Sequence, residues 1–141
     1  MPASCISRKS RYSIKGEYGV SGNKYLLDTN ILLYLIGKKI PVDALPEGEF
    51  SVSFVTELEV LSYPSITPQE EQQLKRFLHD IPVIDITAEI KERAIDLRKK
   101  YNLRLPDAII AATTLQLGAT LVTNDKGFSI VREIQVRSVL P

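Results

Sequence analysis

The most constraining stretch of the sequence is residues 24–30 (KYLLDTN), in which a short apolar run ends at an acid and a small polar pair. Apolar residues resume over residues 31–36, so the pattern predicts a buried strand, a tight turn and a helix. In open α/β sheets, ligands bind in the crevice at the carboxyl ends of the strands. Asp28 is therefore expected at such an edge, and the question is which other acids join it there.

Length and composition indicate one ordinary globular domain. The chain has 141 residues, of which 44% are hydrophobic and 25% are charged. No apolar run approaches the ~20 residues that span a bilayer, and the first residues lack the apolar core of a secretory signal. With one cysteine (Cys5) and one histidine (His79), an internal disulfide is excluded and a Cys/His zinc site is untenable. We therefore expect a cytoplasmic protein without a membrane anchor.

The charge of the chain is unevenly distributed. Residues 1–24 hold five basic side chains and one acidic one, whereas the rest of the chain holds 13 basic and 16 acidic ones. We predict that residues 1–23 are a basic, flexible extension and that residues 24–141 form the folded domain; a functional basic arm is the alternative. A mildly acidic domain needs a cation or local basic patches to bind a polyanion.

Strand and helix patterns alternate along the remainder of the chain. Strands are predicted at about 50–54, 81–86, 119–122 and 134–139, and helices at about 55–63, 68–79, 88–101 and 108–117. Thr67 and Glu70 form the signature of a capping box at the start of one helix. Because several strands are apolar on both faces, the fold class expected is a three-layer α/β/α sandwich with a central, largely parallel sheet.

Four acids are placed where one edge of that sheet could gather them. Asp28 and Asp125 follow predicted strands. Glu59 lies about one helical turn beyond another strand, and Asp107 starts a helix. Ionised carboxylates crowd together only with a counter-charge, because like charges raise their pKa values, and Mg²⁺ or Mn²⁺ with oxygen ligands is the usual one. Neutral oxygens could come from Asn30, Thr123 and Asn124.

Each acid also has an ordinary structural explanation. Asp28 is suited to cap a helix, Asp125 to a turn, and Asp107 to the first turn of a helix. Glu59 could be a surface residue of an amphipathic helix, with Glu57 as an equally charged neighbour. Spacing alone leaves these explanations and a metal site open.

The segments around these acids resemble a known family. They read LLDTN at 26–30, SFVTELEVL at 53–61, LPDAIIAA at 105–112 and LVTND at 121–125. In this order, with helices between them, they are similar to the PIN-domain family, and most similar to its VapC-like branch, the toxin ribonucleases of prokaryotic toxin–antitoxin pairs. The resemblance runs over about residues 24–139, nearly everything except the extension.

Carried over residue by residue, the resemblance implies an acidic catalytic site that holds a metal ion. The family's four acids match, in order, Asp28, Glu59, Asp107 and Asp125. The family pattern Thr-x-x-Glu, here starting at Thr56, favours Glu59 over Glu57. Asn30 and Thr123 match positions that usually support the acids.

The resemblance implies Mg²⁺- or Mn²⁺-dependent cleavage of RNA with 5′-phosphate and 3′-hydroxyl products. A carboxylate-held ion lowers the pKa of a water and stabilises charge on the phosphate and the leaving oxygen. Arg104 and Lys126, close in sequence to two of the acids, are candidates for binding substrate phosphates. Further basic residues could flank the crevice or form a solvated helix face; they are Lys91, Arg93, Arg98, Lys99 and Lys100.

Two partners are also implied by the resemblance. One is a small antitoxin, a segment of which would lie in a groove near the active site. The apolar helices at 31–36 and 55–63 are candidate walls for that groove, or else parts of the core. The other is a second copy of the chain, since VapC-like toxins are commonly homodimers.

Three other functions fit parts of the pattern. A Mg²⁺-dependent phosphatase of the haloacid dehalogenase type needs a second Asp two residues after the first, and this chain has Asn30 there. A receiver-like signalling module would have a paired acid after the first strand and a lysine after the last, and neither is evident. The third alternative is a non-catalytic binding module that keeps the PIN fold.

Overall fold

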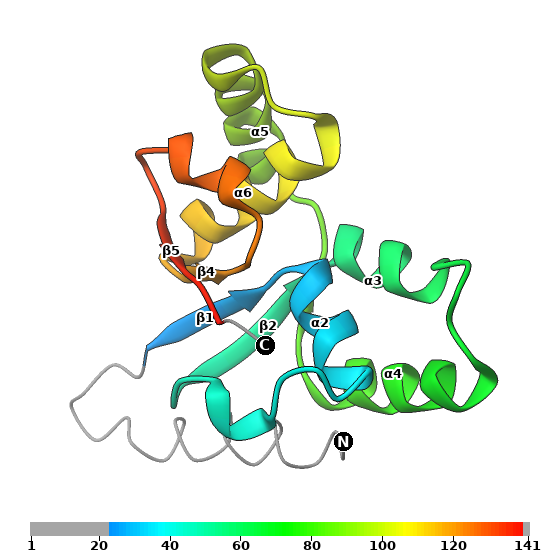
Figure 1. Ribbon diagram of the computed structural model, residues 1–141. Coiled ribbons are helices and arrows are strands. Elements are labelled where there is room, and N and C mark those ends of the chain that lie inside the picture. Colours follow the sequence, from blue (N-terminus) through cyan, green and yellow to red (C-terminus); the bar gives the residue numbers. More distant parts are fainter. Residues whose placement is uncertain (1–22, 140–141) are drawn as a thin grey trace.

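The computed structural model describes residues 23–139, in which strands and helices alternate (Figure 1). The elements in chain order are β1 (Lys24–Leu27), α2 (Thr29–Ile36), η1 (Val42–Ala44), β2 (Glu49–Ser53), α3 (Phe54–Leu61), α4 (Pro68–Asp80), β3 (Val83–Ile84), α5 (Ala88–Tyr101), α6 (Leu105–Leu117), β4 (Thr120–Val122), η2 (Lys126–Ile130) and β5 (Gln135–Arg137). The elements η1 and η2 are short 3-10 helices. Apart from Asn23, the extension predicted at residues 1–23 lies outside the described residues, and so does Cys5. Within the described range, none of the helices has the length and apolar character needed to cross a membrane.

The five strands form one sheet in the order β3-β2-β1-β4-β5, and every neighbouring pair is parallel. The central strand is β1, where Leu26 is in register with Ser51 of β2 and Leu121 of β4. The predicted α/β/α sandwich with a largely parallel sheet is confirmed. Since all the strands run the same way, their carboxyl ends lie along one edge of the sheet.

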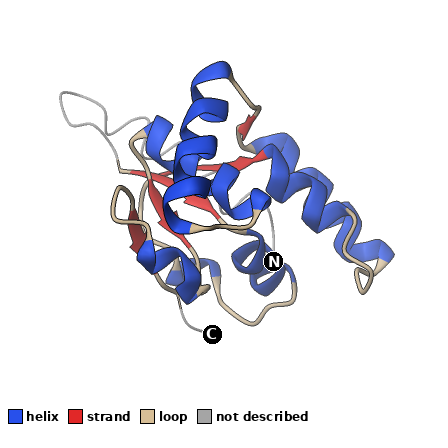
Figure 2. Cartoon of the chain, turned by 90° about the horizontal axis from the view of Figure 1, so that it is seen from above, coloured by secondary structure: helices blue, strands red, loops and turns tan. Residues whose placement is uncertain are grey.

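The pleat of β1 supplies two hydrophobic cores on opposite faces of the sheet. Tyr25 and Leu27 belong to the core shared with α2 and α4, whereas Leu26 belongs to the core shared with α5 and α6. The two pairs of helices lie on opposite sides of the sheet in Figure 1, and from above (Figure 2) helices cross in front of the strands. Burial on both faces explains why residues 25–27 of β1 are all apolar.

Local capping sets where the helices begin. The predicted capping box is confirmed, since Thr67 Oγ1 accepts from the backbone N of Glu70 at 3.1 Å and Glu70 Oε1 accepts from the backbone N of Thr67 at 3.0 Å. The prediction that Phe54 ends a strand is wrong, because Phe54 is the first residue of α3. Ser53 Oγ accepts from the backbone N of Val55 at 3.1 Å and so starts the helix earlier.

Gly48 allows β1 and β2 to approach each other closely at their first rung. A Cβ atom at Gly48 would lie 2.5 Å from Cε2 of Tyr25 and 2.6 Å from the carbonyl oxygen of Asn23. That oxygen accepts the hydrogen bond from the backbone N of Glu49 at 2.8 Å. We expect Gly48→Ala to lower the free energy of unfolding by about 3 kcal/mol, as overpacking against backbone does, in urea denaturation.

Gly118→Ala provides the comparison for this measurement. Gly118 has a φ of +62° but open space around it, so its substitution should cost only backbone strain, about 1 kcal/mol. A Gly48→Ala variant as stable as the wild type would contradict the steric explanation.

Candidate active site

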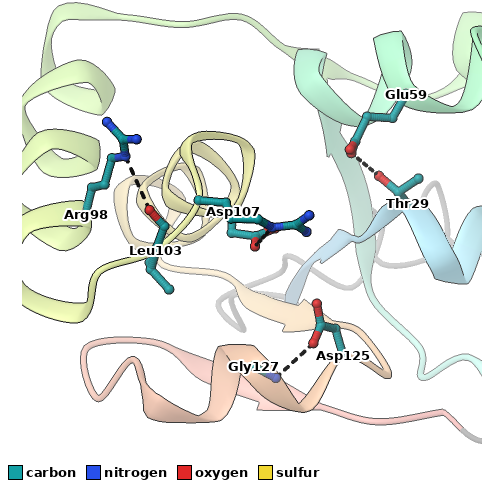
Figure 3. Close-up of polar contacts among 8 residues, drawn as sticks. Thr29, Glu59, Arg98, Leu103, Asp107, Asp125 and Gly127 are labelled. Atoms are coloured by element: carbon teal, nitrogen blue, oxygen red, sulfur yellow. Dashed lines mark hydrogen bonds and ion pairs between the residues drawn. The ribbon is translucent and has the colours of Figure 1, made fainter.

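An acidic edge forms where β1, β2 and β4 end and α6 begins. Asp28 directly follows β1, and Glu59 lies in the helix that follows β2. Asp125 lies in the turn after β4, and Asp107 lies in the first turn of α6. Figure 3 shows the carboxylates of Glu59, Asp107 and Asp125 turned toward a common space. The structure thus places all four predicted acids at the same edge of the sheet.

Asp28 is the buried member of the group, with 6% of its surface exposed. Its Oδ1 accepts a hydrogen bond from the backbone N of Thr29 at 2.8 Å, and its Oδ2 accepts one from Thr123 Oγ1 at 2.7 Å. Its own backbone N donates to the carbonyl of Val122 on β4 at 3.0 Å. The expected role of Asp28 as the N-cap of α2 is therefore present, and the same carboxylate also lies at the acidic edge.

The surroundings of Asp28 oppose its ionisation. Burial raises the pKa of Asp28 most, and the like charges of Glu59 and Asp107 raise this pKa further. The hydrogen bonds from Thr123 and Thr29 lower it and only partly offset these effects. A carboxylate in this position is therefore suited to a positive partner.

Glu59 is exposed, but a threonine holds its carboxylate. Thr29 Oγ1 donates to Glu59 Oε1 at 2.7 Å and lies 3.4 Å from Thr56 Oγ1. Because the charge of Glu59 also acts on Asp28, the geometry favours Glu59 over its neighbour Glu57. The role of Thr29 was missed in the sequence, where its only signal was its position directly after the first acid.

Asp107 forms an ion pair inside the first turn of α6. Arg104 Nε donates to Asp107 Oδ2 at 3.2 Å, with 80% of the arginine side chain and 22% of the aspartate side chain exposed. The pKa of Arg104 is raised, first by its hydrogen bond to Asp107 and the charge of that residue, and then by the charges of Asp125 and Glu59. Arg104, a predicted substrate-binding residue, therefore lies within the field of the acids.

The turn after β4 holds Asp125 and connects it with Asp28. Asp125 Oδ1 accepts from the backbone N of Gly127 at 2.9 Å, which is the turn expected from the sequence. The backbone N of Asp125 donates to Thr123 Oγ1 at 3.0 Å, so one threonine hydroxyl contacts both acids. Lys126, the other predicted substrate-binding residue, is exposed at the start of η2.

The two asparagines near the acids differ in their roles. Asn30 Oδ1 accepts from the backbone N of Asn124 at 3.4 Å, so Asn30 braces the turn that holds Asp125. The side chain of Asn124 donates to the carbonyl of Val139 at 2.6 Å and accepts from Val139 N and Ser138 Oγ. The idea that Asn124 supplies an oxygen to the site is wrong, because both ends of its amide are bonded to the C-terminal segment.

The predicted basic face of α5 is partly used for packing. Arg93 Nε donates to Gln116 Oε1 on α6 at 2.7 Å, and Arg98 Nε donates to the carbonyl of Leu103 at 3.3 Å. Figure 3 shows Arg98 directed at Leu103 and away from the acids. Arg93 therefore links α5 to α6, and Arg98 links α5 to the connection that precedes α6; neither of these hydrogen bonds involves one of the four acids.

The donor atoms at this edge suit a hard divalent cation. Carboxylate oxygens with hydroxyl support are the ligands that Mg²⁺ and Mn²⁺ take, and the like charges around Asp28 call for a positive partner. The described part of the chain contains no group of three acidic, His or Cys side chains arranged as a ready-made metal site. The acids are therefore gathered along one edge without being drawn together around a single point.

Comparison with known proteins agrees with this geometry. The family model for the PIN domain matches residues 25–134. A solved toxin–antitoxin complex from Klebsiella pneumoniae contains a chain with 32% identity, which matches 78% of this chain and 94% of its own length with a TM-score of 0.65. A chain of VapBC2 from Rickettsia felis, solved bound to a DNA fragment from the VapBC2 promoter, has 25% identity, coverage of 82% and 98%, and a TM-score of 0.70.

A chain of VapBC-1 from nontypeable Haemophilus influenzae shares the fold, with 24% identity, coverage of 82% and 97%, and a TM-score of 0.66. Among curated proteins, none matches this chain significantly.

The raised pKa of Asp28 predicts a pH-dependent effect of Asp28→Asn on stability. The folded chain keeps this proton to a higher pH than the unfolded chain, whose value is near the ordinary 3.8. Stability is therefore lost as the pH rises through the folded-state pKa, and an asparagine avoids that loss. In EDTA, Asp28→Asn should have a higher Tm than the wild type at pH 7.5, and the gap should close as the pH approaches 3.8.

Circular dichroism melts at several pH values measure this difference. Asp43→Asn, which changes an exposed acid in η1, is the matched control and should show no such pH-dependent gap. A Tm difference of the same size at every pH would argue against the ionisation of Asp28 as its cause.

Proposed function

The chain belongs to the PIN domain family, and we propose that it is a Mg²⁺- or Mn²⁺-dependent ribonuclease that acts in the cytoplasm as the toxin of a toxin–antitoxin pair. One observation carries the proposal: four segments far apart in the sequence bring acids to the same end of a parallel sheet. The relatives in solved toxin–antitoxin complexes support the toxin assignment.

The acids proposed to hold the ion are Asp28, Glu59, Asp107 and Asp125. The chemistry that such an ion supplies is activation of a water molecule and stabilisation of charge on the phosphate. The protein's own groups orient the acids: Thr123 Oγ1 holds one oxygen of Asp28, and Thr29 Oγ1 holds one oxygen of Glu59. Arg104 and Lys126 are proposed to bind RNA phosphates beside the acids.

The alternatives fit the site less well. For a phosphatase of the haloacid dehalogenase type, the acid–base position two residues after Asp28 is occupied by Asn30, whose amide oxygen accepts from the backbone of Asn124 at 3.4 Å. A non-catalytic module would have no need for four acids at one edge, where burial and two neighbouring acids oppose the ionisation of Asp28. The ribonuclease proposal explains why the chain keeps these acids close together although the arrangement disfavours the ionised form of Asp28.

Cleavage of labelled RNA by the purified protein tests the ribonuclease proposal. Activity should require Mg²⁺ or Mn²⁺, stop in EDTA and leave 5′-phosphate ends. Asp28→Asn should lose about 100-fold or more, since changes in groups that merely support metal ligands already cost about 10- to 100-fold. Asp43→Asn, in which an exposed acid of η1 is replaced, should retain full activity. Equal cleavage by Asp28→Asn and the wild type would indicate a contaminant and refute the proposal.

A groove beside α2 is the proposed binding site of an antitoxin segment. It includes Asn30, which contacts the turn that holds Asp125. It has a volume of about 380 Å³ and is lined by α2, by the connection between α3 and α4 and by the first half of α4, with Leu33, Tyr34, Ile66 and Leu74 among its apolar residues. Of the two helices expected as walls, only α2 serves as one. The segment predicted at 55–63 contributes Tyr63 alone, because α3 ends at Leu61. The rest of that side is formed by Ser65 and Ile66 of the α3–α4 connection and by Glu70 and Leu74 of α4. Apolar side chains of an antitoxin segment would fit such a groove.

A second groove supports the expected homodimer. It lies between α5 and α6 with a volume of about 540 Å³, and its apolar lining includes Ile95 and Leu105, which are 56% and 54% exposed. Along α5, Glu92 precedes Ile95 and Arg98 follows it, each by three residues. Two copies of α5 packed antiparallel about Ile95 would place Glu92 opposite Arg98 of the other copy, while Lys91 would face Lys99. On the exposed apolar lining and the Glu92–Arg98 pairing, we propose a second copy of the chain as the occupant.

The homodimer proposal predicts that Ile95→Glu converts the protein to a monomer, because it would bury an unpaired carboxylate in the interface. Sedimentation velocity measures the change. Ile130→Glu is the matched control, since Ile130 is 51% exposed and does not line this groove. The proposal is refuted if Ile95→Glu remains dimeric, or if the wild-type protein sediments as a monomer at micromolar concentration.

A further inference from the structure

Arg104 occupies an unusual position at the start of α6. It is the N-cap residue of this helix, yet its side chain makes no capping hydrogen bond. Instead, the guanidinium reaches forward to Asp107, where Nε and Oδ2 are 3.2 Å apart. The backbone of Arg104 thus starts the helix, while its side-chain charge interacts with the acidic edge.

The guanidinium of Arg104 is the positive charge paired with the acids of the candidate site. Where both members of an ion pair lie within residues 23–139, the other pairs are His79 with Asp80 and Lys100 with Glu133, and neither includes an acid of the candidate site. Arg104 is therefore the only cation in this range that forms an ion pair with one of the four acids. Two further members, Glu59 and Asp125, also act on Arg104 through their charges.

We propose that Arg104 is a built-in counter-cation, whose guanidinium neutralises the acidic edge of the metal-free protein and competes with a divalent ion for Asp107. The inference rests on the proposed function in that it takes the acids to be metal ligands. Arg104 carries one charge and contacts Asp107 through a single nitrogen, Nε. An ion that draws on several carboxylates at once would displace it, and the displaced side chain would be free to contact a phosphate.

The exposure of the pair determines how the competition works. Because 80% of the Arg104 side chain is in solvent, its ion pair with Asp107 is weak and easily broken. A weak competitor does not prevent metal binding but raises the concentration of metal that is needed. Arg104 would thus set a metal threshold for the site, in addition to any later contact with RNA.

Binding of Mn²⁺ to the full-length, metal-free protein tests this inference by isothermal titration calorimetry. In 50 mM salt, Arg104→Gln should bind Mn²⁺ about 3- to 10-fold more tightly than the wild type, because the competing cation and its repulsion of the metal are both removed. Arg104→Lys keeps the charge and should stay closer to the wild type. The gain of Arg104→Gln should shrink in 500 mM salt, which screens exposed charges.

Arg76→Gln is the matched control, because Arg76 is an exposed arginine of α4 that lines neither of the grooves proposed for partners. Unchanged or weaker Mn²⁺ binding by Arg104→Gln would overturn the inference. An equal gain in Arg76→Gln would also overturn it, since net charge alone would then explain the effect. Melting temperatures of both variants show whether they are folded before titration.

The same titration separates this inference from the proposed function. Absence of Mn²⁺ binding by the wild type would refute both. Binding that is lost in Asp28→Asn but equal in the wild type and Arg104→Gln would leave the metal site in place and refute only the role of Arg104. Binding that is lost in Asp28→Asn and tightened in Arg104→Gln is the result expected.

Discussion

The parallel pairing of β1 with β2 on one side and β4 on the other is the interaction on which the rest of the structure depends. It places the ends of three strands together, and the pairing continues one residue further, where the backbone N of Asp28 donates to Val122 O at 3.0 Å. A slip of one residue in this register would turn Leu26 and Leu27 to the wrong cores. The hydrophobic pattern of β1 therefore positions the acid that follows it.

Gathering like charges at this edge has a free-energy cost, and the surrounding residues show how the fold tolerates it. Asp28 is buried beside two other acids, which raises its pKa, and hydroxyl and backbone donors offset part of that cost. Arg104 offsets another part from the solvent side. Perturbed acids of this kind are typical of functional sites, where stability is given up for chemistry. The candidate site is accordingly held by polar contacts rather than by packing.

The two surfaces proposed for partners are formed by helices on opposite faces of the sheet. One groove is lined by α2, the α3–α4 connection and α4, and the other lies between α5 and α6. These two groups of helices are on different sides of the sheet (Figure 1). Leu105 faces the second groove while Asp107 does not line it, because residues two apart on a helix project roughly 200° apart. The first turn of α6 thus contributes Leu105 to the groove proposed for a partner and Asp107 to the acidic edge.

The sequence by itself determined the alternation of strands and helices and the parallel sheet, and it pointed to four candidate acids, of which Glu59 was preferred to Glu57 only through the family resemblance. The fold follows from local patterns such as apolar runs and caps like Thr67, whereas spacing alone left both a metal site and ordinary structural roles open for the acids. The sequence did not determine that Thr123 holds Asp28, 95 residues away, or that Thr29 holds Glu59, 30 residues away.

Nor could the sequence show that Asn124 turns toward the C-terminal segment, or that the α3–α4 connection and α4 line the groove in place of α3. Side-chain partners distant in sequence depend on how the strands and helices are packed, and that packing is set by the whole core rather than by any one segment. Only the tertiary structure decides them.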